Sequence, residues 1–206
     1  DTKESYEYYL RHFVNDLWHS AFNDEKKTIQ KTKKAKSRHK FRNEIRTTFL
    51  DEYDQATKLK IPSDYAFEKE GEIAKPTLMQ RYFALMVKLR PFYGNFSGTG
   101  AGKTIAALLA SRINKSKMNL IICPNGVVDQ WEKVIKKVFP NSKTTTKGNI
   151  FSTIRDKNEF QYLIINYEQF QLEEKRVENN ILKLASQKID FVNLDEIHFS
   201  KTTSLK

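Results

Sequence analysis

Eight consecutive residues, Ser97 to Thr104, have the types and spacing of a phosphate-binding loop. Three glycines alternate with other residues, so that successive backbone N–H groups can converge on an anion with no Cβ in the way. Lys103 can reach the β- and γ-phosphates, and the Thr104 hydroxyl can ligate Mg²⁺. The predicted nucleotide-binding residues are Gly98, Thr99, Gly100, Ala101, Gly102, Lys103 and Thr104.

Two alternatives compete with the phosphate-binding loop. The usual pattern begins with glycine, and because Ser97 holds that place, a chance glycine-rich turn remains an alternative. A dinucleotide-binding fingerprint would need a third glycine at position 103, where this chain has lysine. The phosphate-binding loop is therefore the favoured interpretation.

A pair of acids, Asp195 and Glu196, directly follows the apolar run 189–194. Adjacent carboxylates at a strand end can divide the work of phosphoryl transfer. Asp195 would hold the Mg²⁺ that bridges the β- and γ-oxygens, and Glu196 would orient and deprotonate the attacking water. The alternative is an ordinary turn after a strand.

These residues need a scaffold, and the apolar pattern predicts one. Short apolar runs predict strands at 91–96, 120–123, 162–165 and 189–194, and helical spacing predicts helices that start near Pro76, Ile105, Val127 and Val177. Residues 142–160 are ambiguous, with a short polar strand at 144–146 and a helix from Ile150 as the expectation. Such alternation indicates a parallel sheet covered on both faces, which binds ligands at the carboxyl ends of its strands.

The first 62 residues have a different character. Apolar spacing predicts a helix over 4–22, and Phe49, Leu50 and Tyr53 suggest another. Between them, Lys26 to Arg46 carries ten basic residues and one acid, in a chain with a net charge of +11. This run suits a polyanionic partner, with a solvated helix face or a flexible arm as the alternatives.

Composition excludes several classes of protein. Cys123 is the single cysteine, so no intrachain disulfide or cysteine-rich metal site is possible, and a reducing compartment (cytoplasm, or nucleus in a eukaryote) is expected. No apolar run approaches the ~18 residues of a membrane span. The polar first residues do not resemble a signal peptide.

Five segments follow one another along the chain: Gln80, SGTGAGKT, LIICPNGVVDQWEKVI, LIINYEQF and NLDEIHFSK. In order and spacing they resemble the superfamily 2 helicases, most of all the first ATPase lobe of the Swi/Snf-like DNA translocases. The resemblance covers roughly residues 76–203. Ser97 and the lack of an acidic lead before the loop depart from the Swi/Snf pattern. The resemblance implies a RecA-like fold, ATP and Mg²⁺ as cofactors, and nucleic acid, with duplex DNA favoured, as the partner.

The resemblance also implies roles for individual residues. Gln80 would contact the adenine, and Lys103, Thr104, Asp195 and Glu196 would carry hydrolysis. His198 would couple the nucleotide state to a second lobe. The nucleic-acid track would pass near Pro124, Asn125, Asn166 and Tyr167.

These observations predict three parts: a basic helical appendage at 1–62, a linker at 63–75 and a RecA-like ATPase lobe at 76–206. We expect the chain to be a piece of a longer motor. A second lobe and a later strand, between the phosphate-loop strand and the Asp-Glu strand, would lie further along it, so this chain alone would hydrolyse ATP weakly.

The expected function is ATP-driven movement on double-stranded DNA. The alternatives are an RNA- or DNA-unwinding helicase, the motor subunit of a restriction-type complex, and a nucleic-acid-binding module that does not hydrolyse ATP.

Overall fold

The computed structural model describes residues 33–90, 92–146, 150, 153–170, 172 and 174–197, with backbone alone for 33–43 and 45. The chain divides into two units between Leu59 and Lys60.

The first unit contains one described helix, α3 (Lys33–Thr57). It includes Phe49, Leu50 and Tyr53, which the sequence assigned to a helix, and it also takes in the second part of the basic run, residues 33–46. The backbone of that part is therefore helical. The helix expected over 4–22 and the start of the basic run, 26–32, lie outside the described residues.

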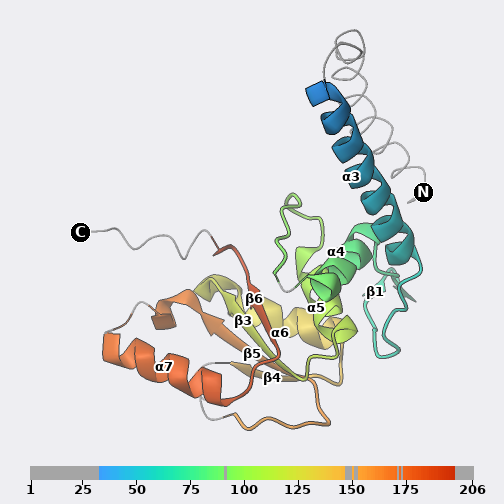
Figure 1. Ribbon diagram of the computed structural model, residues 1–206. Helices are drawn as coiled ribbons and strands as arrows, with labels where there is room; N and C mark the ends of the chain where they lie inside the picture. Colours follow the sequence, from blue (N-terminus) through green and yellow to red (C-terminus); the bar gives the residue numbers. More distant parts are fainter. Residues whose placement is uncertain are drawn as a thin grey trace. The chain divides into compact units, whose positions relative to one another are not determined.

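The second unit is built on a parallel sheet of four strands in the order β4-β5-β3-β6 (Figure 1). The strands are β3 (Met118–Cys123), β4 (Lys143–Thr146), β5 (Gln161–Asn166) and β6 (Phe191–Leu194). Each neighbouring pair is parallel, and β3 pairs with β5 from Met118↔Gln161 to Cys123↔Asn166. The predicted fold class, a RecA-like parallel α/β sheet, is confirmed.

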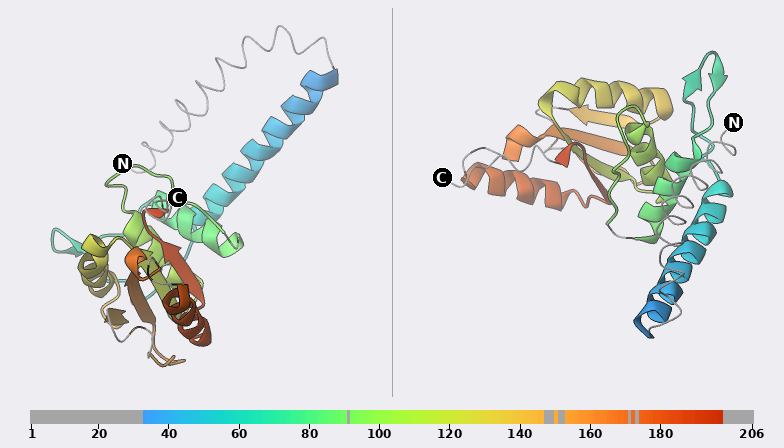
Figure 2. Two further views of the ribbon diagram at one scale, coloured as in Figure 1. Left: turned by 90° about the vertical axis from the view of Figure 1, so that its left-hand side faces the viewer. Right: turned by 90° about the horizontal axis from the view of Figure 1, so that it is seen from above.

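Helices cover both faces of this sheet. On one face, α5 (Lys103–Ile113) and α6 (Val128–Val138) pack on Ile121, Cys123, Tyr162 and Ile164. On the other face, Leu184 of α7 (Glu174–Ser186) packs on Met118, Leu120, Leu163 and Ile165. The right-hand view of Figure 2 shows the strands between α6 and α7. The central strands are apolar at nearly every position because side chains on both of their faces are buried.

The crossover connections explain why the helices lie on opposite faces. The chain leaves β3, passes through α6 and enters β4 on one side; it leaves β5, passes through α7 and enters β6 on the other. A right-handed crossover that moves in the opposite direction along a sheet must use the opposite face. The connection that leaves β3 runs in one direction along the sheet, and the connection that leaves β5 runs in the other. A crevice is therefore expected at the carboxyl ends of β3, β5 and β6.

Helix α4 (Leu78–Leu89) precedes the glycine-rich loop and packs against α5. Thr77 caps its first turn in a reciprocal capping box with Gln80, and the following Pro91 disfavours further helix. The helix was predicted. Its buried side carries Leu78, Ala84 and Leu85, whereas the apolar Met79 and Leu89 are exposed.

Three segments differ from the expectation. Residues 92–96, expected as part of a strand, pair with no strand in the described chain, where the sheet ends at β6. The stretch expected as a linker, 63–75, holds a small hairpin of β1 (Glu68–Lys69) and β2 (Glu72–Ile73), and its Tyr65 is buried against Phe139. After Ile150, residues 153–160 form a loop without a helix.

Candidate nucleotide-binding site

The glycine-rich loop turns sharply before α5. Gly100 and Gly102 have φ values of 78° and 74°, a left-handed backbone conformation that glycine adopts without steric cost. Gly102 is the residue before the first turn of α5, and no side chain caps that turn. The first N–H groups of a helix have no partner within the helix, so this turn can donate to an anion.

Lys103, the first residue of α5, folds back over the loop. Its Nζ donates to the carbonyl oxygens of Ser97 at 3.1 Å and Gly98 at 3.3 Å. Ser97, which stands where glycine is usual, is itself held by Asn95, whose side-chain oxygen accepts from the Ser97 N–H at 3.2 Å and contacts its hydroxyl. The ammonium group is thus held at the loop.

Gln80 is joined to the same loop from α4. Its Nε2 donates to the Gly102 carbonyl oxygen at 3.3 Å, and its Oε1 accepts from the Thr77 N–H at 2.8 Å. The side chain is buried, and both ends of its amide are engaged. This contact links α4 to the loop; the adenine contact of Gln80 stays a prediction.

The two acids lie where β6 ends. The Asp195 N–H donates to the Ile122 carbonyl oxygen at 2.8 Å, which extends the β3–β6 ladder by one residue. Glu196 then takes a φ of 52°, a left-handed conformation that costs a residue with a Cβ about 1–2 kcal/mol. Strained residues cluster at functional sites, and this one directly follows Asp195 at the end of β6.

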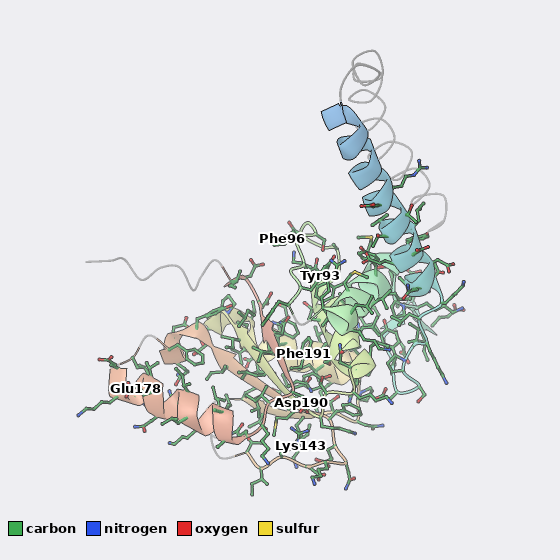
Figure 3. All side chains as sticks on the ribbon, viewed as in Figure 1. Tyr93, Phe96, Lys143, Glu178, Asp190 and Phe191 are labelled. Carbon is green, nitrogen blue, oxygen red and sulfur yellow. The ribbon has the colours of Figure 1, made fainter. Side chains whose placement is uncertain are left out.

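The loop and the acids line one open cleft of about 1490 Å³. Ser97, Lys103 and Thr104 contribute to it from the loop, and Asp195 and Glu196 from the end of β6. Tyr93 and Phe96, which lie on the segment before the loop, and Phe191 of β6 line the same cleft (Figure 3). Residues more than 90 positions apart in the sequence therefore share one concave surface.

Asp195 receives two hydrogen bonds that the sequence did not predict. The Trp131 indole Nε1 donates to Asp195 Oδ2 at 2.8 Å, and the Tyr167 hydroxyl donates to the Asp195 carbonyl oxygen at 2.9 Å. Trp131 belongs to α6, and Tyr167 begins the short helix η4 (Tyr167–Phe170) after β5. The signal for Trp131 was its place in the CP…W segment, which suggested a family but no contact.

Burial and the acids together raise the pKa of two neighbouring groups. Burial, followed by the charge of Asp195, raises the pKa of the Tyr167 phenol to about 12, so it keeps the proton that it donates. Burial, followed by the charges of Asp195 and Glu168, raises the pKa of the Cys123 thiol to about 12. Cys123 is free and buried, and as a neutral thiol it is a poor nucleophile at neutral pH.

The residues predicted along the nucleic-acid track lie at the carboxyl ends of β3 and β5. The Asn166 side-chain nitrogen donates to Asn125 Oδ1 at 2.8 Å and so joins the end of β5 to the short helix η2 (Asn125–Val127). Pro124 precedes η2, and Tyr167 follows Asn166 with its hydroxyl on Asp195. His198 lies outside the described residues. A nucleic-acid role for these residues stays a prediction.

The available metal donors suit Mg²⁺ bound together with a nucleotide. In the described ranges, no group of three or more His, Cys, Asp or Glu side chains could hold a metal ion by itself. Mg²⁺ usually takes one or two protein oxygens and completes its shell with phosphates and water. The Thr104 hydroxyl and the Asp195 carboxylate in one cleft fit that pattern.

A parallel sheet with helices on both faces, a glycine-rich loop that opens α5 and an acid pair after β6 define a RecA-like α/β domain. Residues 96–206, just over half of the chain, match the family described as type III restriction enzyme, res subunit, and the chain belongs to this family. It is a family of helicase-like ATPases of superfamily 2, which use ATP and Mg²⁺ and interact with nucleic acid. A comparison with curated proteins found none that matches the chain.

No helix in the described ranges combines the length and the apolar character that crossing a bilayer requires.

Proposed function

We propose that this chain supplies the ATP-binding lobe of a motor that couples ATP hydrolysis to movement along double-stranded DNA. One observation carries the proposal: the Lys103–Thr104 end of the loop and the Asp195–Glu196 pair line the same cleft. Phosphoryl transfer needs a cation on the β/γ-phosphates, two oxygen ligands for Mg²⁺ and a base for water, and this cleft offers each of them.

In this proposal the residues have separate tasks. Lys103 leaves the carbonyl oxygens of Ser97 and Gly98 and binds the β/γ-phosphates as a positive charge. Thr104 and Asp195 hold Mg²⁺, which neutralises charge on the transferring phosphate when it is bound. Glu196 accepts a proton from the attacking water and so acts as the general base.

Nucleic acid would contact the face where β3 and β5 end. The Asn125–Asn166 pair lies there, and asparagine side chains both donate to and accept from a polynucleotide backbone. The basic run 26–46 supports a polyanionic partner independently. Duplex DNA is favoured because the order of Gln80, the CP…W segment and the DExH acids resembles that of the Swi/Snf-like translocases.

A second candidate function is the motor subunit of a restriction-type complex, and the family match over residues 96–206 favours it. Both candidates share the same ATP site and differ in the partner proteins. A third possibility, an unwinding helicase, differs in its response to single strands.

Nucleotide binding is tested by titration calorimetry with ADP and Mg²⁺ on the Lys103→Ala variant. Removal of a charge-assisted bond worth about 1.5–3 kcal/mol predicts affinity lower by roughly 10- to 150-fold. Lys133→Ala, an exposed change elsewhere on the lobe, is the control and should bind as the wild type does. Equal affinity in the Lys103 variant would refute the loop assignment.

The nucleic-acid partner is tested by phosphate release from the complete motor, because the lobe alone is expected to hydrolyse ATP weakly. The release is measured with duplex DNA, with single-stranded DNA and without nucleic acid. Stimulation by duplex DNA alone, lost in Glu196→Gln, is the expected result. Equal stimulation by single strands would favour the unwinding helicase instead.

A further inference from the structure

We propose that Trp131 and Tyr167 are positioning residues that fix the orientation of Asp195 for metal binding. This inference rests on the proposed function, because it assigns a task around the acid that is proposed to hold Mg²⁺. It concerns residues for which the motif pattern gave no role at the metal.

Asp195 is held at three of its polar groups by three different elements. Its N–H donates to the Ile122 carbonyl oxygen on β3, its carbonyl oxygen accepts from Tyr167 at the start of η4, and its Oδ2 accepts from Trp131 on α6. The distances are 2.8, 2.9 and 2.8 Å, all within the range of good hydrogen bonds. Backbone and side chain are thus fixed together.

The two donors are themselves rigidly placed. The Trp131 side chain is 3% exposed and packs in the core with Ile135 and Cys123. Tyr167 is 8% exposed, and its hydroxyl lies 2.9 Å from the Asp195 carbonyl oxygen. A buried indole N–H or phenol needs an acceptor, and both find one on the same acid.

The Asp195 carboxylate has two oxygens, and Trp131 donates a hydrogen bond to only one of them, Oδ2. Within the described residues no hydrogen bond to Oδ1 is found, so this oxygen is open to a cation, and the bond to Oδ2 determines which way Oδ1 points. Partners that orient a metal-binding carboxylate in this manner typically change metal affinity by about 10- to 100-fold when they are removed.

A purely structural role is the competing explanation, in which Asp195 merely satisfies a buried indole. The two roles differ in their consequences. A structural bond changes the stability of the fold and leaves metal affinity alone, whereas a positioning bond changes the affinity for the metal in the nucleotide complex.

The test uses the full chain, saturating ADP and Mn²⁺ as a paramagnetic substitute for Mg²⁺, with free Mn²⁺ measured by electron paramagnetic resonance. Trp131→Phe keeps an aromatic ring and removes the N–H, and we expect Mn²⁺ to bind about 10-fold more weakly. Tyr167→Phe removes one neutral hydrogen bond to the backbone and should weaken binding by about two- to tenfold. ADP affinity without metal should stay unchanged in both.

Tyr162→Phe is the matched control. Its hydroxyl lies 2.8 Å from Ser111 Oγ in the core, on the same strand that leads to Tyr167. Its loss should lower the melting temperature and leave Mn²⁺ affinity unchanged. If Trp131→Phe does not fold, Tyr167→Phe tests the same inference.

The outcomes separate the inference from the proposed function. If Asp195→Asn weakens Mn²⁺ binding but both aromatic variants bind as the wild type does, the positioning role is refuted and the ATP site stands. If Asp195→Asn also binds Mn²⁺ normally, the metal assignment itself is refuted, and the positioning role with it.

Discussion

Alanine substitutions at three glycines of the loop provide a graded test of how this turn is built. The glycines differ in two respects: whether φ is positive, and what a Cβ would meet. Gly98 has no positive φ and open space around it; Gly100 has a φ of 78° and open space; Gly102 has a φ of 74° and the Gln80 amide directly in the way.

The expected costs follow from these differences. Gly98→Ala should change the free energy of unfolding by less than about 1 kcal/mol, because alanine mainly reduces the entropy of the unfolded chain. Gly100→Ala should cost about 1 kcal/mol, the penalty for a left-handed residue with a Cβ less that entropy gain. Gly102→Ala should cost about 1–3 kcal/mol more than Gly100→Ala, because the displaced Gln80 loses its bonds to Gly102 and Thr77.

The assay is urea unfolding of the full chain without nucleotide, so that any effect on phosphate binding is kept out of the measurement. The same Gly102→Ala change in a Gln80→Ala background isolates the clash, and its cost should fall to that of Gly100→Ala. Equal costs for Gly100→Ala and Gly102→Ala in the wild-type background would show that the contact between Gln80 and the loop does not constrain this turn.

Three further predictions concern two side chains of the lobe and the basic run, Lys26–Arg46. The Arg112 side chain is 1% exposed, stacks on Phe160 at 3.6 Å and pairs with Asp64 at 3.4 Å. Asp64→Ala leaves this buried cation without its acid and should lower the free energy of unfolding by about 3–5 kcal/mol, as measured by urea unfolding. A cost below about 1 kcal/mol, as for an exposed ion pair, would contradict a buried-cation role. Burial raises the Asp190 pKa, but the bonds from Met118, Arg155 and Lys117 outweigh it, so the folded pKa is lowered. The difference in free energy of unfolding between the wild type and Asp190→Ala should therefore be largest above the unfolded pKa of about 4 and should shrink as the pH falls below it. A difference that stays constant down to about pH 2 would contradict this. If about five charges of Lys26–Arg46 meet phosphates, deletion of residues 1–62 should make the log–log salt slope of duplex binding shallower by roughly 4–5, and an unchanged slope would identify a solvated face.

Much of the lobe could be predicted from the sequence because its central strands are buried on both faces. The runs at 120–123 and 162–165 are short and almost wholly apolar, and both lie within strands of the sheet. The helical spacing of apolar residues that follows Pro76 similarly predicted α4. Such signals are local, so the sequence carries them without reference to the rest of the fold.

The segment before the loop shows where local pattern fails. Residues 92–96 have the apolar character of a strand, yet Phe92 and Phe96 are 90% and 96% exposed. A strand needs a partner for its backbone groups as well as a suitable composition, and β6 pairs in the described chain only with β3. Composition alone does not reveal whether that partner is present.

The candidate site could likewise be predicted only in part. The spacing of residues 97–104 and the position of Asp195 after an apolar run predicted two groups at carboxyl ends of strands, and the cleft contains both. The sequence could not predict that Trp131, 64 positions before Asp195, would donate to it, because a motif gives position along the chain and leaves the partner of each side chain open.

The hydrogen bonds around Asp195 connect the proposed ATP site with the face assigned to nucleic acid. Trp131 lies on the helix that follows Asn125, and Tyr167 follows Asn166 directly. The Asn125–Asn166 bond ties the starts of these two segments together, so both donors to Asp195 belong to one connected group. A polynucleotide that displaced either asparagine would act on segments that also hold Asp195. Coupling between two sites requires a physical element that both can bias, and in this lobe the short segments after β3 and β5 have that position.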